Sequence, residues 1–369
     1  MDPHVAWWGI ARRASVVVTA GLIVGCGGGG NGTAAATASP TTVAGLAAYH
    51  GADRQQLLEA GARKEGTLTF YSRPTSDVNR ALADAFQAKY PFITKVDIFG
   101  ASETDLINRA TTEANAGQPS FDVVESPPTT TIVLTENKLT ARYFSPSLAG
   151  VPDELKSGLR DGLVDSTTVR LSYVGFGLNT KLIPESAAPK TLQDLLNPAL
   201  AGKIAIAGST TGKRWLGSVL HALGPDKGKA FLQQFATQQK PTVQQVSGRA
   251  LLDLIAKGEV PASTTIYSSH VAAAVSKSHA PVQWIPIDPV VANVDQLALA
   301  ARSPHPNAAL LFIDFIMGPD GQKIFPKYGY DTPGEKPSFS VWIPEVGKSS
   351  QQIQQEVKDW DQLFKTLFR

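Results

Sequence analysis

Residues 202–225 read GKIAIAGSTTGKRWLGSVLHALGP, and two hydrophobic periodicities follow each other within them. Ile204 and Ile206 alternate with small residues, which is typical of a short buried strand. Trp215 and Val219 then recur at helical spacing. We therefore expect a strand that passes through a short turn directly into a helix.

The predicted turn consists of small and hydroxyl residues: Gly208, Ser209, Thr210, Thr211 and Gly212. A hydroxyl side chain can cap a helix, and the first backbone N–H groups of the helix remain available to bind an anion. Two interpretations are open. Either a hydroxyl is only a helix cap, or the turn forms part of an anion site, which Lys213 and Arg214 would favour.

The composition indicates a large globular protein. The chain has 369 residues, of which 43% are hydrophobic and 18% charged, with a formal net charge of +2. A chain of this length exceeds the usual size of one compact domain, so we expect two lobes. The nearly balanced charge argues against a nucleic-acid partner.

The N-terminal segment has the pattern of a bacterial lipoprotein signal peptide. Arg12 and Arg13 precede an apolar run, which ends with a glycine before Cys26. The alternative, a transmembrane anchor, is weaker because the run is short for a bilayer. We expect residues 1–25 to be the signal peptide and residues 26–45 a flexible tether, lipid-anchored through Cys26.

This pattern also predicts where the protein lies. The lipid on Cys26 would hold the folded body in the cell envelope, on the outer side of the cytoplasmic membrane or in the periplasm. Cys26 is the only cysteine in the sequence. An intrachain disulfide and a catalytic thiol in the body are therefore excluded.

Strands, polar loops and helices alternate along the first part of the body, with strands expected at residues 67–72, 94–99 and 122–125. This order favours a mostly parallel sheet covered by helices, with a ligand at the carboxyl ends of the strands. A serine stands at or just after each strand end, and Arg73 follows the first: Ser72, Ser102 and Ser126. We expect these residues to share a binding site.

Later segments predict the connection between two lobes. Residues 168–179, which include Tyr173, form a long extended segment that can cross from one lobe to the other. Residues 287–295 are a candidate second crossing. Residues 262–267 are expected to be a strand that leads through Ser268 into an alanine-rich helix.

Four motifs occur in a characteristic order: LTFYS at 68–72, GFGLNTKL at 175–182, GKIAI at 202–206 and SPHPNAA at 303–309. With them, the chain resembles the bacterial extracellular solute-binding proteins of ABC importers. The resemblance is to the branch that contains ferric-iron binders and their phosphonate- and phosphosugar-binding relatives. It extends from about residue 66 to residue 322.

The resemblance implies a two-lobed α/β fold of the periplasmic-binding-protein type II. Each lobe would contain a mostly parallel sheet flanked by helices, with a ligand cleft between the lobes. Lobe 1 would comprise residues 46–172 plus 290–335, and lobe 2 residues 173–289 plus 336–369. The protein would be a monomer without a cofactor that delivers a solute to the permease and ATPase subunits of an importer.

Two ligand classes follow from the resemblance. Iron-binding relatives hold ferric ion with adjacent tyrosines before an alanine-rich helix, whereas this chain has Tyr267 alone there, with Glu125 as a possible second ligand. A small anion, such as a phosphonate, phosphate ester or carboxylate, agrees better with the loops. The expected ligand-binding residues are Ser72, Arg73, Ser102, Ser126, Tyr173, Ser209, Thr210, Thr211, Gly212, Tyr267 and Ser268.

Import has two alternatives. A lipoprotein of this type could report its ligand to a sensor kinase instead of feeding a permease. An enzyme is not expected, because the sequence lacks a Gly-x-Ser-x-Gly elbow and a P-loop.

Overall fold

The computed structural model describes residues 40–73, 76–119 and 121–368. The predicted signal peptide and Cys26 lie outside the described residues. Helix α1 (Val43–Ala48) begins two residues before the predicted end of the tether at residue 45, because Thr42 caps it and Leu46 is buried in the core. The folded body therefore starts earlier than the sequence indicated. No described helix combines the length and apolar character needed to span a membrane.

The remaining elements alternate as expected. The helices are α2 (Arg54–Glu65), α3 (Ser76–Lys89), α4 (Glu103–Asn115), α5 (Pro128–Glu136), α6 (Thr210–Leu223), α7 (Pro225–Gln239), α8 (Gly248–Lys257), α9 (Ser268–Ser278), α10 (Pro306–Met317), α11 (Pro319–Gln322) and α12 (Ser350–Leu367). The strands are β1 (Thr67–Ser72), β2 (Lys95–Gly100), β3 (Val123–Ser126), β4 (Thr140–Ala141), β5 (Lys156–Ser157), β6 (Ser166–Asn179), β7 (Ile204–Ala207), β8 (Thr242–Gln244), β9 (Ala262–Tyr267), β10 (Val282–Ile285), β11 (Val290–Ala300) and β12 (Val341–Trp342). Short 3-10 helices η1 (Pro146–Gly150), η2 (Asp153–Leu155), η3 (Glu185–Ala187), η4 (Gln193–Leu196), η5 (Pro198–Leu200) and η6 (Phe325–Tyr328) lie in the connections.

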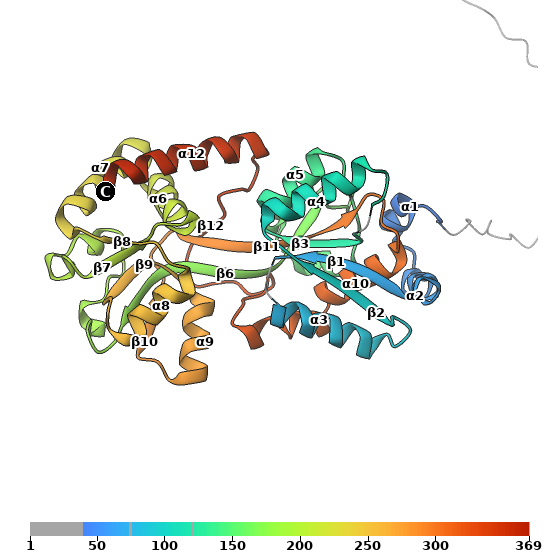
Figure 1. Ribbon diagram of the computed structural model, residues 1–369, viewed down its shortest axis with the longest axis horizontal. Coiled ribbons are helices and arrows are strands. Elements are labelled where there is room, and N and C mark those ends of the chain that lie inside the picture. The colour runs from blue at the N-terminus through green and yellow to red at the C-terminus, as the bar shows by residue number, and fades with distance from the viewer. Residues whose placement is uncertain (1–39, 74–75, 120, 369) are drawn as a thin grey trace, which may run out of the picture. The chain divides into compact units, whose positions relative to one another are not determined.

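The strands form one continuous sheet in the order β2-β1-β3-β11-β6-β9-β7-β8 (Figure 1). β1 is parallel to β2 and β3, and β7 is parallel to β8 and β9. The long strands β6 and β11 pair antiparallel between these two groups. We call β1, β2, β3 and their helices the β1 side, and β7, β8, β9 and their helices the β7 side. The sheet is thus parallel toward both ends, as predicted, and antiparallel in the middle.

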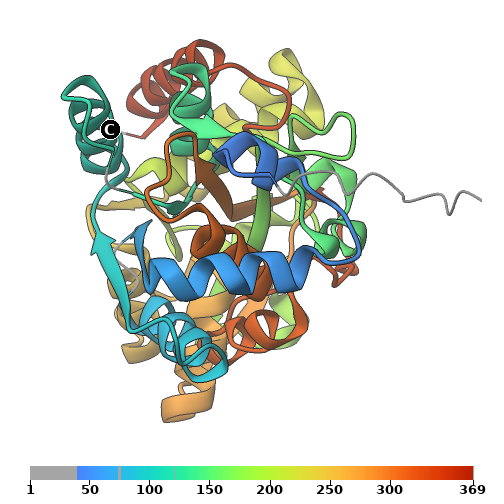
Figure 2. The same cartoon turned by 90° about the vertical axis from the view of Figure 1, so that its right-hand side faces the viewer.

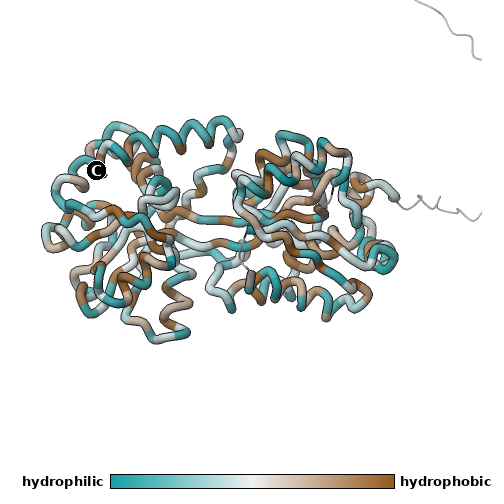
Figure 3. Tube along the Cα trace, viewed as in Figure 1, coloured by the Kyte–Doolittle hydropathy of each residue, from teal (hydrophilic) through white to brown (hydrophobic). Residues whose placement is uncertain are grey.

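Each side has its own hydrophobic core. The core of the β1 side includes Phe70, Phe86 and Phe312, and Figure 2 shows α2 across the front of this side, where it contacts α10. The core of the β7 side includes Ile206 and Trp215. Hydrophobic residues are concentrated in the strands and in α10, whereas much of α12 is hydrophilic (Figure 3). A smaller apolar cluster lies on β6 and β11.

The strand-to-helix unit predicted at residues 202–225 is confirmed as β7 and α6. Ser209 is the N-cap of α6, and its hydroxyl accepts a hydrogen bond from the backbone N–H of Thr211 at 3.4 Å. Gly212 packs against β7 so closely that a Cβ atom there would lie 1.9 Å from the carbonyl oxygen of Ala207. This contact fixes where the helix starts relative to the end of the strand.

The second predicted crossing and the strand after it are one element, β11, which pairs with β6 along most of its length. Helix α12 packs on α6 and α7 of the β7 side. Ser350 at its start also hydrogen-bonds Glu136 of α5, with 3.0 Å between the Ser350 backbone nitrogen and a Glu136 carboxylate oxygen.

Candidate functional site

On the β1 side, the strand ends hold a buried network of charges. Glu125 and Arg170 are each 1% exposed, and the Arg170 Nε lies 2.5 Å from a Glu125 oxygen. Arg170 also lies 3.0 Å from Asp295, which in turn pairs with Arg73 at 2.5 Å. Ser72 donates a hydrogen bond to the second Glu125 oxygen at 3.0 Å. Two arginines and two carboxylates therefore neutralise one another beneath the loops.

The environment of Arg170 keeps it charged. Burial alone would lower the pKa of Arg170, but the Asp295 and Glu125 carboxylates outweigh burial and raise it. The pKa of Arg73 is also raised, because Asp295 offsets the cost of its burial. The geometry thus gives Arg73 an ion-pair partner within the protein, where the sequence had suggested that it holds a ligand, and gives Glu125 a guanidinium partner in place of a metal ion.

The other serines predicted on this side bond locally. Ser102 caps α4, accepting a hydrogen bond from the Asp105 backbone N–H at 3.2 Å. Ser126 is buried and donates to the Thr130 hydroxyl at 2.9 Å. Their part in a shared binding site stays a prediction.

On the β7 side, two of the predicted residues meet. The hydroxyls of Thr211, in the first turn of α6, and Tyr267, at the end of β9, lie 2.9 Å apart. Both residues are partly exposed. The two neighbouring cations already have ion-pair partners within the protein. Lys213 lies 2.5 Å from Asp361, and Arg214 pairs with Glu345. The turn therefore presents hydroxyl groups and backbone N–H groups without these two positive charges.

The start of helix α8 packs against Tyr267. Gly248 opens α8, and a Cβ atom on it would lie 3.2 Å from the Tyr267 ring. The next residue, Arg249, is exposed and forms no ion pair with any residue that the structure describes. The ring of His270 lies 5.1 Å from that of Tyr267, and burial together with the nearby Arg249 lowers the pKa of His270 to about 4. His270 is thus neutral at pH 7, and Arg249 supplies the positive charge here.

A cavity of about 740 Å³ lies at the start of α8, where Arg249 lines it, and is lined from both sides of the sheet. Helix α3 and η6 line it from the β1 side, and α8 and α9 from the β7 side. Its charged lining residues are Arg249, Lys277 and Lys327 against Asp77. These cations could not be grouped from the sequence because they stand far apart in the chain. The one available signal was Arg249, directly after the start of a capped helix.

The side chain of Tyr173 does not point toward Tyr267 and Arg249. Successive residues of a strand face opposite ways, so Tyr173 and Ser172 lie on different faces of β6. The Ser172 hydroxyl bonds that of Ser269 at 2.7 Å, whereas the Tyr173 ring packs edge-on against Phe339 at 4.9 Å. Ser268 uses its hydroxyl to accept from the Tyr173 backbone N–H at 3.0 Å. The Tyr173 ring is therefore directed away from Tyr267, and the packing of Tyr173 on a ligand stays a prediction.

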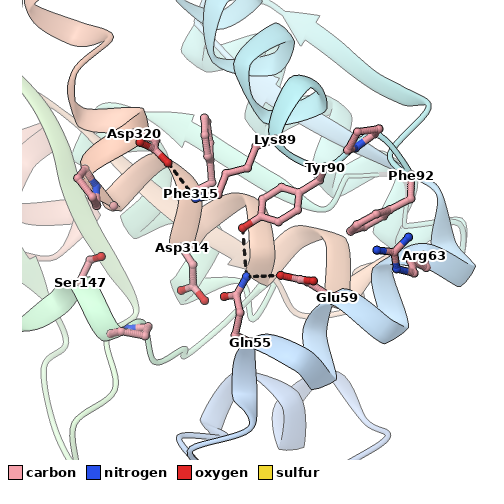
Figure 4. A pocket seen from close by; sticks show the side chains of 14 residues that line it. Gln55, Glu59, Arg63, Lys89, Tyr90, Phe92, Ser147, Asp314, Phe315 and Asp320 are labelled. Atoms are coloured by element: carbon pink, nitrogen blue, oxygen red, sulfur yellow. Dashed lines mark hydrogen bonds and ion pairs between the residues drawn. The ribbon is translucent and has the colours of Figure 1, made fainter.

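A different cavity, of about 690 Å³, opens on the β1 side between α2, α3 and α10 (Figure 4). Lys89 lies 2.9 Å from Asp320, and the amide of Gln55 donates a hydrogen bond to Glu59 at 2.8 Å, whereas Arg63 lies over the Phe92 ring. Both acidic and basic side chains line this cavity, and all of them belong to the β1 side. It therefore lacks the excess of positive charge that distinguishes the cavity beside Arg249.

The described residues contain no group of three His, Cys, Asp or Glu side chains placed to hold a metal ion. Tyr267 and Glu125, the residues considered for iron, are hydrogen-bonded to Thr211 and Ser72 respectively.

Comparison with solved structures shows the same fold in several binding proteins. Iron-bound HitA from Pseudomonas aeruginosa is 21% identical, with a TM-score of 0.65 over 80% of this chain and 99% of that one. AfuA from Actinobacillus pleuropneumoniae with fructose-6-phosphate is 18% identical, with a TM-score of 0.61 over 81% and 98%. A putative extracellular solute-binding protein from Bordetella parapertussis is 15% identical, with a TM-score of 0.69 over 83% and 100%.

At these identities the likeness establishes the fold alone, which is the type II periplasmic-binding-protein fold expected from the sequence. A comparison with curated protein sequences gave no match. The model of the family of bacterial extracellular solute-binding proteins matches residues 81–338. That segment includes β2, β3, both long strands and every helix start of the candidate site on the β7 side. The chain therefore belongs to the bacterial extracellular solute-binding proteins, which bind and deliver solutes for ABC importers and are not enzymes.

Proposed function

We propose that this solute-binding protein captures a small anion, such as a phosphonate, a phosphate ester or a carboxylate, between the β1 side and the β7 side. The observation that carries the proposal is the cavity of about 740 Å³, which both sides line and in which Arg249 has no described ion-pair partner. Thr211 and Tyr267 do not line this cavity, but the Tyr267 ring packs against Gly248, the neighbour of Arg249, and we propose the two hydroxyls as further hydrogen-bonding groups.

The energetics require several such groups. Micromolar binding corresponds to about 8 kcal/mol, and the dipole of one helix N-terminus supplies only roughly 0.3–1 kcal/mol. A hydrogen bond to a charged group adds about 1.5–3 kcal/mol. Arg249, the two hydroxyls and the N–H groups of α6 and α8 would together reach this range if all of them contacted one ligand. None of them would suffice alone.

The long strands β6 and β11 suggest how ligand binding could change the conformation that the permease contacts. We propose that residues 46–172 plus 290–335 form one lobe and residues 173–289 plus 336–369 the other, with β6 and β11 as the connection. A ligand that contacts both lobes only when they approach would shift the population toward the closed state. The permease could then distinguish loaded from empty protein.

Lipid anchoring is a separate part of the proposal, since Cys26 lies outside the described residues. A lipid on Cys26 would keep the binder close to its permease. In cells fed radioactive palmitate, the full chain should incorporate label and its Cys26→Ser variant should not. Equal labelling of both would refute the anchor.

The ligand class can be decided by thermal shift with the full chain. A ligand that binds only the folded state raises the melting temperature by mass action. We expect a shift with a member of a panel of phosphonates, phosphate esters and carboxylates. A shift confined to ferric citrate would refute the anion proposal and support iron, which HitA binds in its solved structure.

The variant Tyr267→Phe sharpens the result. Tyr267 stands in the loop before the alanine-rich helix α9, and this position favours iron as the second candidate ligand. Loss of the phenol oxygen would abolish iron binding and its visible phenolate band. For an organic anion it would remove one hydrogen bond and weaken binding by about tenfold.

A further inference from the structure

A third cavity, of about 580 Å³, lies against the face of β6 that carries Leu171 and Tyr173. Residues 333–346 form its other wall, and we call them the back segment. Because side chains alternate along a strand, this face is opposite to the one that carries Arg170 and Ser172. The cavity is therefore separate from the proposed anion site, whose neighbours lie on the Arg170 face.

The lining is largely aromatic and aliphatic. The ring of Phe339 lies edge-on to Tyr173 at 4.9 Å and to Trp284 at 5.6 Å. Trp342 also lines the cavity. Among the described residues, six large hydrophobic side chains are notably exposed, and two of them, Val341 at 36% and Val346 at 51%, are part of this lining. Such a concave apolar surface of a few hundred cubic ångströms is typical of a small-molecule site.

The charges around the cavity have a negative excess. Glu154 and Glu335 line it, against the single cation Lys336. Burial raises the pKa of Tyr173 to about 12, and the Asp331 and Glu335 carboxylates add to the effect, so their negative potential reaches the ring. An aromatic wall under a negative potential attracts a cation, because the face of each ring is itself electron-rich.

We propose that the cavity behind β6 binds an amphiphilic organic cation: an aromatic or branched apolar body that carries one ammonium group. The body would pack against Leu171, Tyr173 and Phe339, and the ammonium would face Glu335 and Glu154. This second site takes a ligand of opposite charge to that of the proposed anion site. The two sites therefore do not compete for one molecule.

The test uses two probes that share an indole ring and differ in charge. Tryptamine carries an ammonium group, whereas indole-3-propionate carries a carboxylate. In calorimetric titrations of the full chain, tryptamine should bind at least about tenfold more tightly than indole-3-propionate, as expected from paired charges and cation–π contact. Equal affinities, or no binding of tryptamine, would overturn the proposal.

Two variants locate the binding. Phe339→Ala removes an aromatic wall and should weaken tryptamine binding by about tenfold. Glu335→Gln removes the charge of an exposed side chain and keeps its shape. This variant should therefore fold even if Phe339→Ala does not. It should also weaken tryptamine binding, by about three- to tenfold.

The matched control is Glu259→Gln, since Glu259 is also an exposed glutamate, follows α8 and does not line the cavity. Its affinity for tryptamine should equal that of the unchanged chain. If Glu335→Gln binds tryptamine as tightly as Glu259→Gln does, the cation does not lie in this cavity and the proposal fails.

Discussion

The two sides of the sheet present polar groups at their strand ends in different ways. On the β1 side, Glu125, Arg170 and Asp295 are nearly fully buried and pair with one another. On the β7 side, Thr211 and Tyr267 are partly exposed and bond to each other through neutral hydroxyls, and Arg249 is exposed beside them. Charge on the β1 side stabilises the protein, whereas charge on the β7 side is available to a ligand.

The difference has a physical origin. A buried charge must be paired, because its desolvation costs several kcal/mol, and a paired charge has little left to offer a ligand. An exposed arginine at a helix start keeps most of its hydration until a ligand displaces the water. Substitutions on the two sides should therefore affect different quantities, stability on the β1 side and affinity on the β7 side.

The largest expected effect is that of Glu125→Ala. This change leaves Arg170 buried without its closest carboxylate, and breaking a buried pair in this way costs about 3–5 kcal/mol. The free energy of unfolding, measured by urea denaturation, should fall by that amount.

The control for Glu125→Ala is Asp97→Ala on the neighbouring strand β2. Asp97 pairs with Lys95 at 2.6 Å, but its side chain is 50% exposed, so its loss should cost less than about 1 kcal/mol. Equal losses for the two variants would show that the β1-side network contributes no more than a surface pair.

The second effect concerns Arg249→Gln. Removing this charge should weaken binding of the anion found in the thermal-shift panel by at least about tenfold, since one charge-assisted hydrogen bond contributes about 1.5–3 kcal/mol. The melting temperature of the unliganded protein should stay the same, because Arg249 has no described ion-pair partner to lose.

Arg63→Gln is the matched control for Arg249→Gln. Arg63 is an exposed arginine in the cavity of Figure 4, where it lies over the Phe92 ring at 4.2 Å. Its loss should leave anion affinity unchanged. A greater loss of affinity in Arg63→Gln than in Arg249→Gln would move the anion site to the β1 side.

Local elements could be predicted from the sequence because their signals are local. Strand β9 has the predicted bounds, and the β7–α6 unit follows the two periodicities of residues 202–225. Strand β11 was predicted in two parts. Asn293 and Asp295 interrupt its hydrophobic pattern, yet Asp295 is buried through its pairs with Arg73 and Arg170.

The candidate site depends on contacts between distant residues, which periodicity does not reveal. Arg73 meets Asp295 across 222 positions, so nothing near Arg73 in the sequence indicates that its charge has a partner. Thr211 was predicted from the hydroxyl turn before a helix and Tyr267 from the resemblance to iron binders, and the geometry brings the two together. Arg249 and the lysines of the cavity come from three separate elements and were missed for that reason.

The smallest effect tests whether Asp122, an acid of the β1 side that directly precedes β3, also serves stability. Asp122 is fully buried and accepts hydrogen bonds from the Thr69 backbone N–H at 2.7 Å and the Ser303 hydroxyl at 2.6 Å. His305 Nδ1 lies 2.9 Å from it. Its hydrogen bond to Asp122 raises the pKa of His305 above 6.5, despite an opposing effect of burial.

A raised pKa means that the folded state holds the proton more tightly than the unfolded chain does. The stabilisation is therefore complete below pH 6.5 and is lost as the pH rises through the folded-state pKa. His305→Gln should be less stable than the unchanged chain by on the order of 1 kcal/mol at pH 6, with the difference shrinking toward pH 9. Urea denaturation across this range measures it, with the exposed His50→Gln as control. A difference that grows with pH would mean that neutral His305 is the stabilising form, and Asp122 would then hold this turn through its backbone and hydroxyl contacts alone.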